Sequence, residues 1–110
     1  MTRPLPSIAE LNDVLRTTFL TGRVILTEGI RSLTDADREE IITKVRTFDA
    51  FTPDNDPYGE HDFGAFDQPG VGKVFWKIDY YDRSLSKGSE DPADPGQTCR
   101  VLTILLAEEY

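Results

Sequence analysis

Residues 74–81 constrain the fold more than any other part of the chain, because their β-branched and aromatic side chains predict a strand. Side chains along a strand alternate between its two faces. One face is apolar and must lie in the core, and it carries Val74, Trp76, Ile78 and Tyr80. The opposite face carries Phe75, Lys77, Asp79 and Tyr81. The chain therefore needs other elements that cover the apolar face.

Two amphipathic segments can supply that cover. Residues 7–18 begin with Ser7, and Glu10 three positions later completes the form of a helix-capping box. Apolar residues then recur at helical spacing. A second helix is predicted to begin after Thr34, where a capping hydroxyl precedes acids in the first turn, and to end near Phe48. Each helix has an apolar stripe that can pack on a sheet.

Three more segments have the composition of strands, namely residues 23–27, 62–66 and 100–107. The first is followed by Glu28 and Gly29, which are expected to end it. The second is joined to the strand over 74–81 by turn residues at 68–72, so these two strands are predicted to form a hairpin.

The predicted order of elements is α-β-α-β-β-β, which indicates the α+β class. The last three strands can pair through short connections, so we expect a mostly antiparallel four-stranded sheet with two helices packed on one face. The shared core is expected to include Ile41, Val45, Trp76 and Ile78. A single domain over residues 1–110 is expected, because this length is too short for two independent cores.

The formal net charge of −8 is concentrated in one segment. Residues 51–70 contain no Lys or Arg and five acids, which are Asp54, Asp56, Glu60, Asp62 and Asp67. Such a segment repels phosphate groups and attracts a basic protein surface, so direct nucleic-acid binding is not expected. The alternative interpretation is a solvated loop whose carboxylates keep the protein soluble.

The only histidine, His61, lies among these acids and raises the question of a metal site. Carboxylates at Asp54, Asp56, Glu60 and Asp62 would suit Mg²⁺, Ca²⁺ or Mn²⁺, and His61 would add a nitrogen ligand. The spacing is not that of an EF-hand loop, and an extended backbone over residues 60–62 would turn His61 away from its two neighbours. We therefore expect no metal and no cofactor. A small metal- or carboxylate-dependent enzyme is the alternative function, and its centre would be the segment with Asp56, Glu60, His61 and Asp62.

Other catalytic arrangements do not occur in the sequence. No lysine has an acid two positions before it, so the acid-x-lysine pair of many nucleases is absent. The segment 70–73 ends in Gly-Lys but lacks the spacing of a phosphate-binding loop. We assign no catalytic residue.

Cysteine usage and hydropathy indicate the compartment. Cys99 is the only cysteine, so no disulfide can form within the chain, which suits a reducing cytoplasm. No apolar run reaches the roughly 20 residues that span a bilayer, and residues 1–7 lack the apolar core of a signal peptide. We expect a cytoplasmic protein without a membrane partner.

Phe75 and Tyr81 indicate where a partner could bind. If the sheet face opposite the helices is open, these aromatic side chains lie near the acidic segment and form the kind of surface that anchors protein interfaces. The expected partner-binding residues are Asp54, Asp56, Glu60, Asp62, Asp67, Phe75 and Tyr81. The expected partner presents a basic protein surface.

Three segments, residues 55–64, 75–82 and 100–110, resemble the signature sequences of a short bacterial family labelled domain of unknown function 3768. The resemblance extends over residues 12–110. It implies no activity and provides no catalytic residue. It implies instead an accessory protein of bacterial chromosomes, plasmids and phage-like regions.

This context leads to the expected function, a non-enzymatic acidic inhibitor that blocks host defence. Small acidic proteins of mobile elements, such as anti-CRISPR or antirestriction inhibitors, place carboxylates on the basic nucleic-acid-binding surface of a defence complex. The enzyme described above is the first alternative. A housekeeping accessory protein with a small-molecule ligand is the second.

Overall fold

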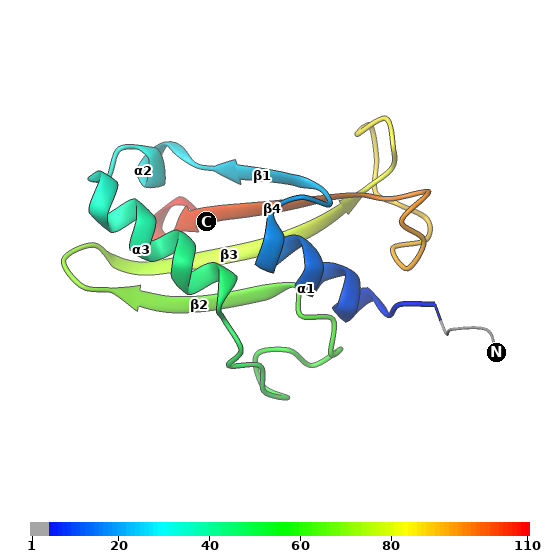
Figure 1. Ribbon diagram of the computed structural model, residues 1–110, viewed down its shortest axis with the longest axis horizontal. Coiled ribbons are helices and arrows are strands. Elements are labelled where there is room, and N and C mark those ends of the chain that lie inside the picture. The colour runs from blue at the N-terminus through cyan, green and yellow to red at the C-terminus, as the bar shows by residue number, and fades with distance from the viewer. Residues whose placement is uncertain (1–4) are drawn as a thin grey trace.

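A four-stranded sheet with the strand order β1-β4-β3-β2 is the centre of the computed structural model, which describes residues 5–110 (Figure 1). The strands are β1 (Arg23–Leu26), β2 (Phe63–Gln68), β3 (Gly72–Tyr81) and β4 (Cys99–Leu106). β2 pairs with β3 and β3 with β4 in antiparallel register, whereas β1 pairs with β4 in parallel register. The predicted α+β class and the antiparallel pairing of the last three strands are confirmed. The parallel edge strand makes the sheet mixed.

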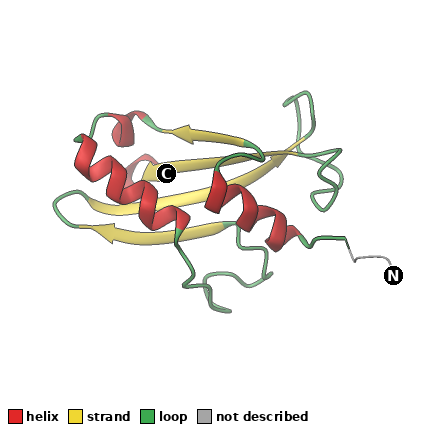
Figure 2. Ribbon diagram, viewed as in Figure 1, coloured by secondary structure: helices red, strands yellow, loops and turns green. Residues whose placement is uncertain are grey.

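Two long helices, α1 (Ile8–Thr18) and α3 (Asp35–Arg46), lie on the same face of the sheet (Figure 2). The side-chain oxygen of Ser7 accepts a hydrogen bond from the N–H of Glu10 at 3.1 Å, and that of Thr34 accepts one from the N–H of Asp37 at 3.1 Å. Both predicted capping residues are therefore confirmed. Helix α3 ends at Arg46, slightly before the predicted end.

The short helix α2 (Glu28–Arg31) stands where the sequence pattern predicts only the end of a strand. Its start is held by a residue at the far end of the chain, because the carboxylate of Glu109 accepts hydrogen bonds from the N–H of Gly29 at 3.0 Å and the hydroxyl of Thr27 at 2.7 Å. Glu109 belongs to a 3₁₀ helix (Ala107–Glu109) that follows β4. The predicted end of the strand is confirmed, but the helix that follows was not predicted, because local sequence contains no signal for a partner so distant.

The core lies between the helices and the sheet, as predicted. Trp76 is completely buried, and it packs in one cluster with Ile41 and Val45 of α3 and with Ile78 of β3. Other fully buried members of the cluster are Leu15, Ile30, Val74, Leu102 and Ile104. The apolar face of β3 is therefore the covered face.

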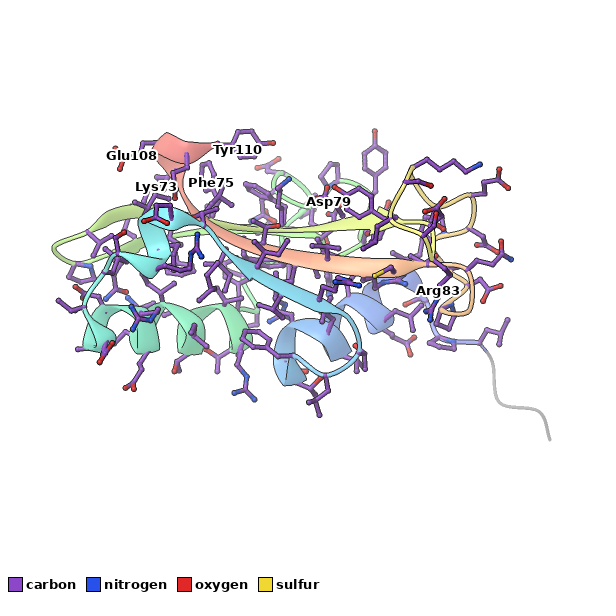
Figure 3. All side chains as sticks on the ribbon, turned by 90° about the horizontal axis from the view of Figure 1, so that it is seen from above. Lys73, Phe75, Asp79, Arg83, Glu108 and Tyr110 are labelled. Atoms are coloured by element: carbon purple, nitrogen blue, oxygen red, sulfur yellow. The ribbon has the colours of Figure 1, made fainter. Side chains whose placement is uncertain are left out.

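Neither long helix packs on the opposite face of the sheet, where the 3₁₀ helix (Ala107–Glu109) and Tyr110 lie against one end of β3 (Figure 3). In a view along the sheet, α1 and α3 lie on one side, and the labelled side chains of Lys73, Phe75 and Asp79 project from the other (Figure 3). None of the helices within residues 5–110 has both the length and the apolar character needed to cross a membrane.

Candidate functional site

The seven sequence-predicted partner-binding residues fall into two regions of the structure. Asp54, Asp56 and Glu60 lie in the loop over residues 49–62, which connects α3 to β2, and Asp62 ends it. Asp67, Phe75 and Tyr81 lie on strands β2 and β3, at positions that face away from the helices. The two regions have different chemistry.

Asp56 stabilises the 49–62 loop from within. It is buried, and its carboxylate accepts hydrogen bonds from the N–H groups of Glu60 at 3.0 Å and His61 at 3.2 Å. The backbone at His61 is left-handed, with φ 55, so the extended conformation considered for residues 60–62 is not present at His61. The carboxylate of Asp56 therefore binds the loop's own backbone.

His61 connects the loop to α1. Its Nδ1 lies 3.0 Å from both carboxylate oxygens of Asp13, and its Nε2 lies 3.7 Å from Oδ2 of Asp56. The imidazole is stacked on the ring of Phe51, with the ring centroids 3.9 Å apart. Sequence reasoning missed Asp13, because nothing in the local pattern of α1 relates it to a histidine far along the chain.

Glu60 belongs to a continuous hydrogen-bonded network beneath the loop. The Tyr80 hydroxyl donates to Oε1 of Glu60 at 2.8 Å, and the amide of Asn12 donates to the Tyr80 hydroxyl at 2.8 Å and to the backbone carbonyl of Glu60 at 2.9 Å. The guanidinium of Arg100 donates to Oδ1 of Asn12 at 2.8 Å. The network therefore joins α1, the loop, β3 and β4.

Burial of this region shifts three pKa values. It raises the pKa of the Tyr80 hydroxyl well above its usual range, and it lowers the pKa of Arg100. Burial also raises the pKa of Asp62, and the neighbouring negative charge of Glu60 adds to that rise. Each shift disfavours a charged form in a poorly solvated place.

The acids of the 49–62 loop do not converge on a common point. Within residues 5–110 no group of three His, Cys, Asp or Glu side chains is arranged to hold a metal ion. Asp54 is exposed, while Asp56 and Glu60 bind backbone and side-chain donors of the protein itself. Asp67 is also exposed, with its carboxylate 3.9 Å from Nζ of Lys73 across the hairpin. The acidic segment is thus divided between a half-buried network and two solvated carboxylates.

Aromatic side chains form a row on the open face of the sheet. The ring of Phe75 lies 5.3 Å from that of Phe63 and 5.6 Å from that of Tyr110, measured between centroids. Tyr110 is 76% exposed. Figure 3 shows Phe75 and Tyr110 together on the side away from the helices. Phe63 and Phe75 are half-buried, and aromatic rings that are in contact and partly exposed are typical of protein interfaces.

A groove of about 420 Å³ lies on the same face, over β1, β4 and the end of β3. Its lining residues are Arg23, Ile25, Lys77, Asp79, Tyr81, Leu85, Val101 and Thr103. Val101 is only 6% exposed and provides an apolar floor, while Nζ of Lys77 pairs with Oδ2 of Asp79 at 2.9 Å on one side. The open face therefore combines a concave apolar surface with charges at its rim.

Comparison with known proteins identifies the family of this chain. Residues 26–109 match the family model described as Protein of unknown function (DUF3768). The chain belongs to this family. The matched range contains the 49–62 loop, the aromatic pair Phe63 and Phe75 and most of the groove. It does not contain α1, nor the two groove residues Arg23 and Ile25. No curated protein and no solved structure matches the chain.

The DUF3768 resemblance that the sequence indicates is thereby confirmed as family membership. The groove of this family member was not predicted, because its walls come from segments that are far apart in sequence. Ile25 reaches it through the parallel pairing of β1 with β4, and Leu85 through a turn after β3. Alternation within β4 was the available signal for Val101, since Leu102 on the adjacent position faces the core.

Proposed function

We propose that this protein is a non-enzymatic binding protein whose open sheet face docks a partner protein. The observation that carries the proposal is the face that the two long helices leave open, where Tyr81 lines a groove with an apolar floor and the rings of Phe75 and Tyr110 lie against each other. Partly exposed aromatic rings and a concave apolar surface are the features that concentrate binding energy in protein interfaces. Helices α1 and α3 pack on the other face of the sheet (Figure 2), so this surface is already formed in the protein without a partner.

The proposed partner carries a basic, nucleic-acid-binding surface, as a host defence complex does. The protein's net charge of −8 supports this choice. Attraction between proteins of opposite net charge acts before they touch and raises the rate of association. Asp54 and Asp67 contribute to that field as exposed carboxylates. Occupation of the basic surface would exclude nucleic acid and inhibit the complex.

An enzymatic role centred on the 49–62 loop has less support. The carboxylate of Asp56 accepts two backbone hydrogen bonds, and that of Glu60 accepts the Tyr80 hydroxyl. His61 interacts with carboxylates on both of its ring nitrogens. A general acid or base needs a nitrogen or oxygen that can reach substrate, whereas these groups are engaged in holding the loop.

Affinity capture with matched variants tests the proposed function. The tagged protein is used to capture partners from the cytosol of the cell that carries its gene, alongside a Phe75→Ala/Tyr81→Ala variant. A Glu39→Ala/Thr43→Ala variant, which changes exposed positions on α3, is the control. We expect the wild type and the control to retain a nucleic-acid-binding protein that the open-face variant loses. Addition of the wild type should then prevent that purified partner from binding nucleic acid.

Two outcomes would contradict the proposal. Capture that is unchanged in the Phe75→Ala/Tyr81→Ala variant would remove the open face from the interface. A captured partner whose nucleic-acid binding persists when the protein is saturating would remove the inhibitory function.

A further inference from the structure

Leu85 lines the groove from a turn with an unusual backbone. The turn covers residues 82–88 and follows β3, and the side chain of Leu85 is 39% exposed. Its φ is 61, in the left-handed region that glycine or asparagine normally occupies. A left-handed backbone at a leucine raises the energy of the folded state, and the exposed side chain leaves apolar surface in water. Neither property stabilises the fold, so the presence of a leucine side chain at this position requires another explanation.

The turn is built to hold this conformation. The carboxylate of Asp82 accepts hydrogen bonds from the hydroxyl of Ser84 at 2.9 Å and from the N–H and hydroxyl of Ser86 at 3.0 and 3.1 Å. The N–H of Leu85 donates to the carbonyl of Asp82 at 3.0 Å, and the N–H of Asp82 donates to the carbonyl of Lys87 at 2.8 Å. The hydrogen bonds to the carboxylate lower the pKa of Asp82. Leu85 is thus presented on a pre-organised turn at the edge of the groove.

The charges around the groove indicate what it receives. Lys77 and Asp79 neutralise each other across a distance of 2.9 Å. Arg23, on the opposite side, has no ion-pair or hydrogen-bond partner for its side chain among residues 5–110. An occupant that complements the groove therefore places an apolar group on Val101 and between Ile25 and Leu85, with a carboxylate that reaches Arg23.

We propose that Leu85 is an apolar anchor of the docking surface, and that the groove receives an apolar side chain of the partner protein next to a carboxylate that pairs with Arg23. This inference rests on the proposed function and specifies one contact within it. The partner's surface is basic overall and carries an acidic residue at this point. Leu85 keeps its strained backbone because the anchor contributes to binding.

Substitutions that suit the backbone separate binding from folding. Leu85→Gly and Leu85→Asn both favour a left-handed conformation, so both should melt at the same temperature as the wild type or higher. Both should weaken the affinity for the captured partner by roughly tenfold or more, the effect of removing a hot-spot side chain. Leu85→Met keeps an apolar side chain and should keep most of the affinity.

A small probe tests the predicted occupant directly. N-acetyl-leucine, which carries a leucine side chain and a carboxylate, is titrated at millimolar concentrations into the isotope-labelled full chain and followed by NMR. Signals of Ile25, Leu85 and Val101 should shift, and N-acetyl-leucine amide, which lacks the carboxylate, should bind several-fold more weakly. Arg23→Gln should abolish the difference between the two probes.

The outcomes distinguish this inference from the proposed function. If Phe75→Ala/Tyr81→Ala loses the partner while Leu85→Gly and Leu85→Asn bind it fully, the anchor is wrong and the docking face stands. If N-acetyl-leucine shifts signals elsewhere, or shifts none in the groove, the proposed occupant is overturned. If the partner binds every open-face variant as tightly as it binds the wild type, the proposed function itself fails.

Discussion

Gly64 allows the main core residue to pack against the sheet. A Cβ at this position would overlap the indole nitrogen of Trp76. The indole is in contact with other groups as well: its centroid lies 5.5 Å from that of Phe48 and 6.1 Å from that of Phe51. The guanidinium carbon of Arg16 lies 5.3 Å from the indole centroid. The strand prediction places residue 64 in a strand but cannot show why it lacks a side chain. Only the pairing of Gly64 with Trp76 across β2 and β3 explains it.

Gly64→Ala should therefore be strongly destabilising. The added methyl group overpacks a rigid site, and we expect the free energy of unfolding to fall by about 1 to 3 kcal/mol. Chemical denaturation followed by Trp76 fluorescence measures the change. Gly88→Ala is the matched control, because a Cβ there would meet only one atom, at an ordinary 3.8 Å. Equal stabilities of the two variants would contradict the packing argument.

Ionisation of Tyr80 should make the free energy of unfolding depend on pH in the alkaline range. Burial raises the pKa of its hydroxyl in the folded protein, and the hydrogen bond to Glu60 opposes ionisation further. An unfolded tyrosine loses its proton near pH 10. The contribution of Tyr80 to stability is therefore complete below pH 10, and it is lost as the pH rises above 10 toward the folded pKa.

Denaturant unfolding at a series of alkaline pH values checks this expectation. The unfolding free energy of the wild type should fall more steeply above pH 10 than that of Tyr80→Phe, which has no proton to lose. Tyrosine absorbance should show one of the four ionisations delayed until the protein unfolds, and this delay should be absent in the variant. Parallel pH curves for the two proteins would show that Tyr80 ionises freely in the folded state.

At the scale of elements, helix α2 depends on the end of the chain. Glu109 accepts hydrogen bonds from Thr27, Gly29 and Leu106, and these bonds lower the pKa of its carboxyl group. A four-residue helix cannot be stable by itself, because helix nucleation is costly. Its formation is therefore coupled to the 3₁₀ helix that carries Glu109.

Glu109→Ala should release α2 from this contact. The expected loss in the free energy of unfolding is about 1 kcal/mol, as for a helix cap. Hydrogen exchange at the amide of Gly29 should become faster in the variant. Glu108→Ala removes an exposed neighbouring carboxylate and should change neither quantity. A Gly29 amide that exchanges equally fast in both variants would contradict the coupling.

At the scale of the whole molecule, the net negative charge should raise the rate of association with a basic partner. Asp54 and Asp67 are exposed, so Asp54→Asn/Asp67→Asn should reduce the association rate with the proposed basic partner more than it changes dissociation. Added salt should slow wild-type association in the same way, because charges are screened beyond about 8 Å at physiological ionic strength. Surface-binding kinetics at low and high salt measure both effects.

Asp56→Asn is a poor choice for the same experiment, because that side chain holds the 49–62 loop and its loss would mix folding with binding. Thermal stability of the Asp54→Asn/Asp67→Asn variant should stay close to that of the wild type. An association rate that responds neither to salt nor to these substitutions would remove long-range attraction from the mechanism.

The sequence by itself determined the features that depend on neighbouring residues. Ser7 and Thr34 cap helices through atoms three positions away, and alternation along 74–81 assigned each side chain of β3 to a face. These signals are local because caps and strand faces are set by backbone geometry over a few residues. They were sufficient for the α+β class, the two long helices and the core around Trp76.

Tertiary structure alone decided how those elements meet. β1 pairs in parallel with the last strand, Glu109 holds Gly29 over a separation of 80 positions, and Arg100 binds Asn12 over 88. It also decided which predicted site residues reach solvent, since Asp54 is exposed whereas Asp56 is buried two positions later. Contacts of this kind arise only when the chain closes on itself, because hydrogen bonds and packing between distant residues leave no periodic pattern in either segment.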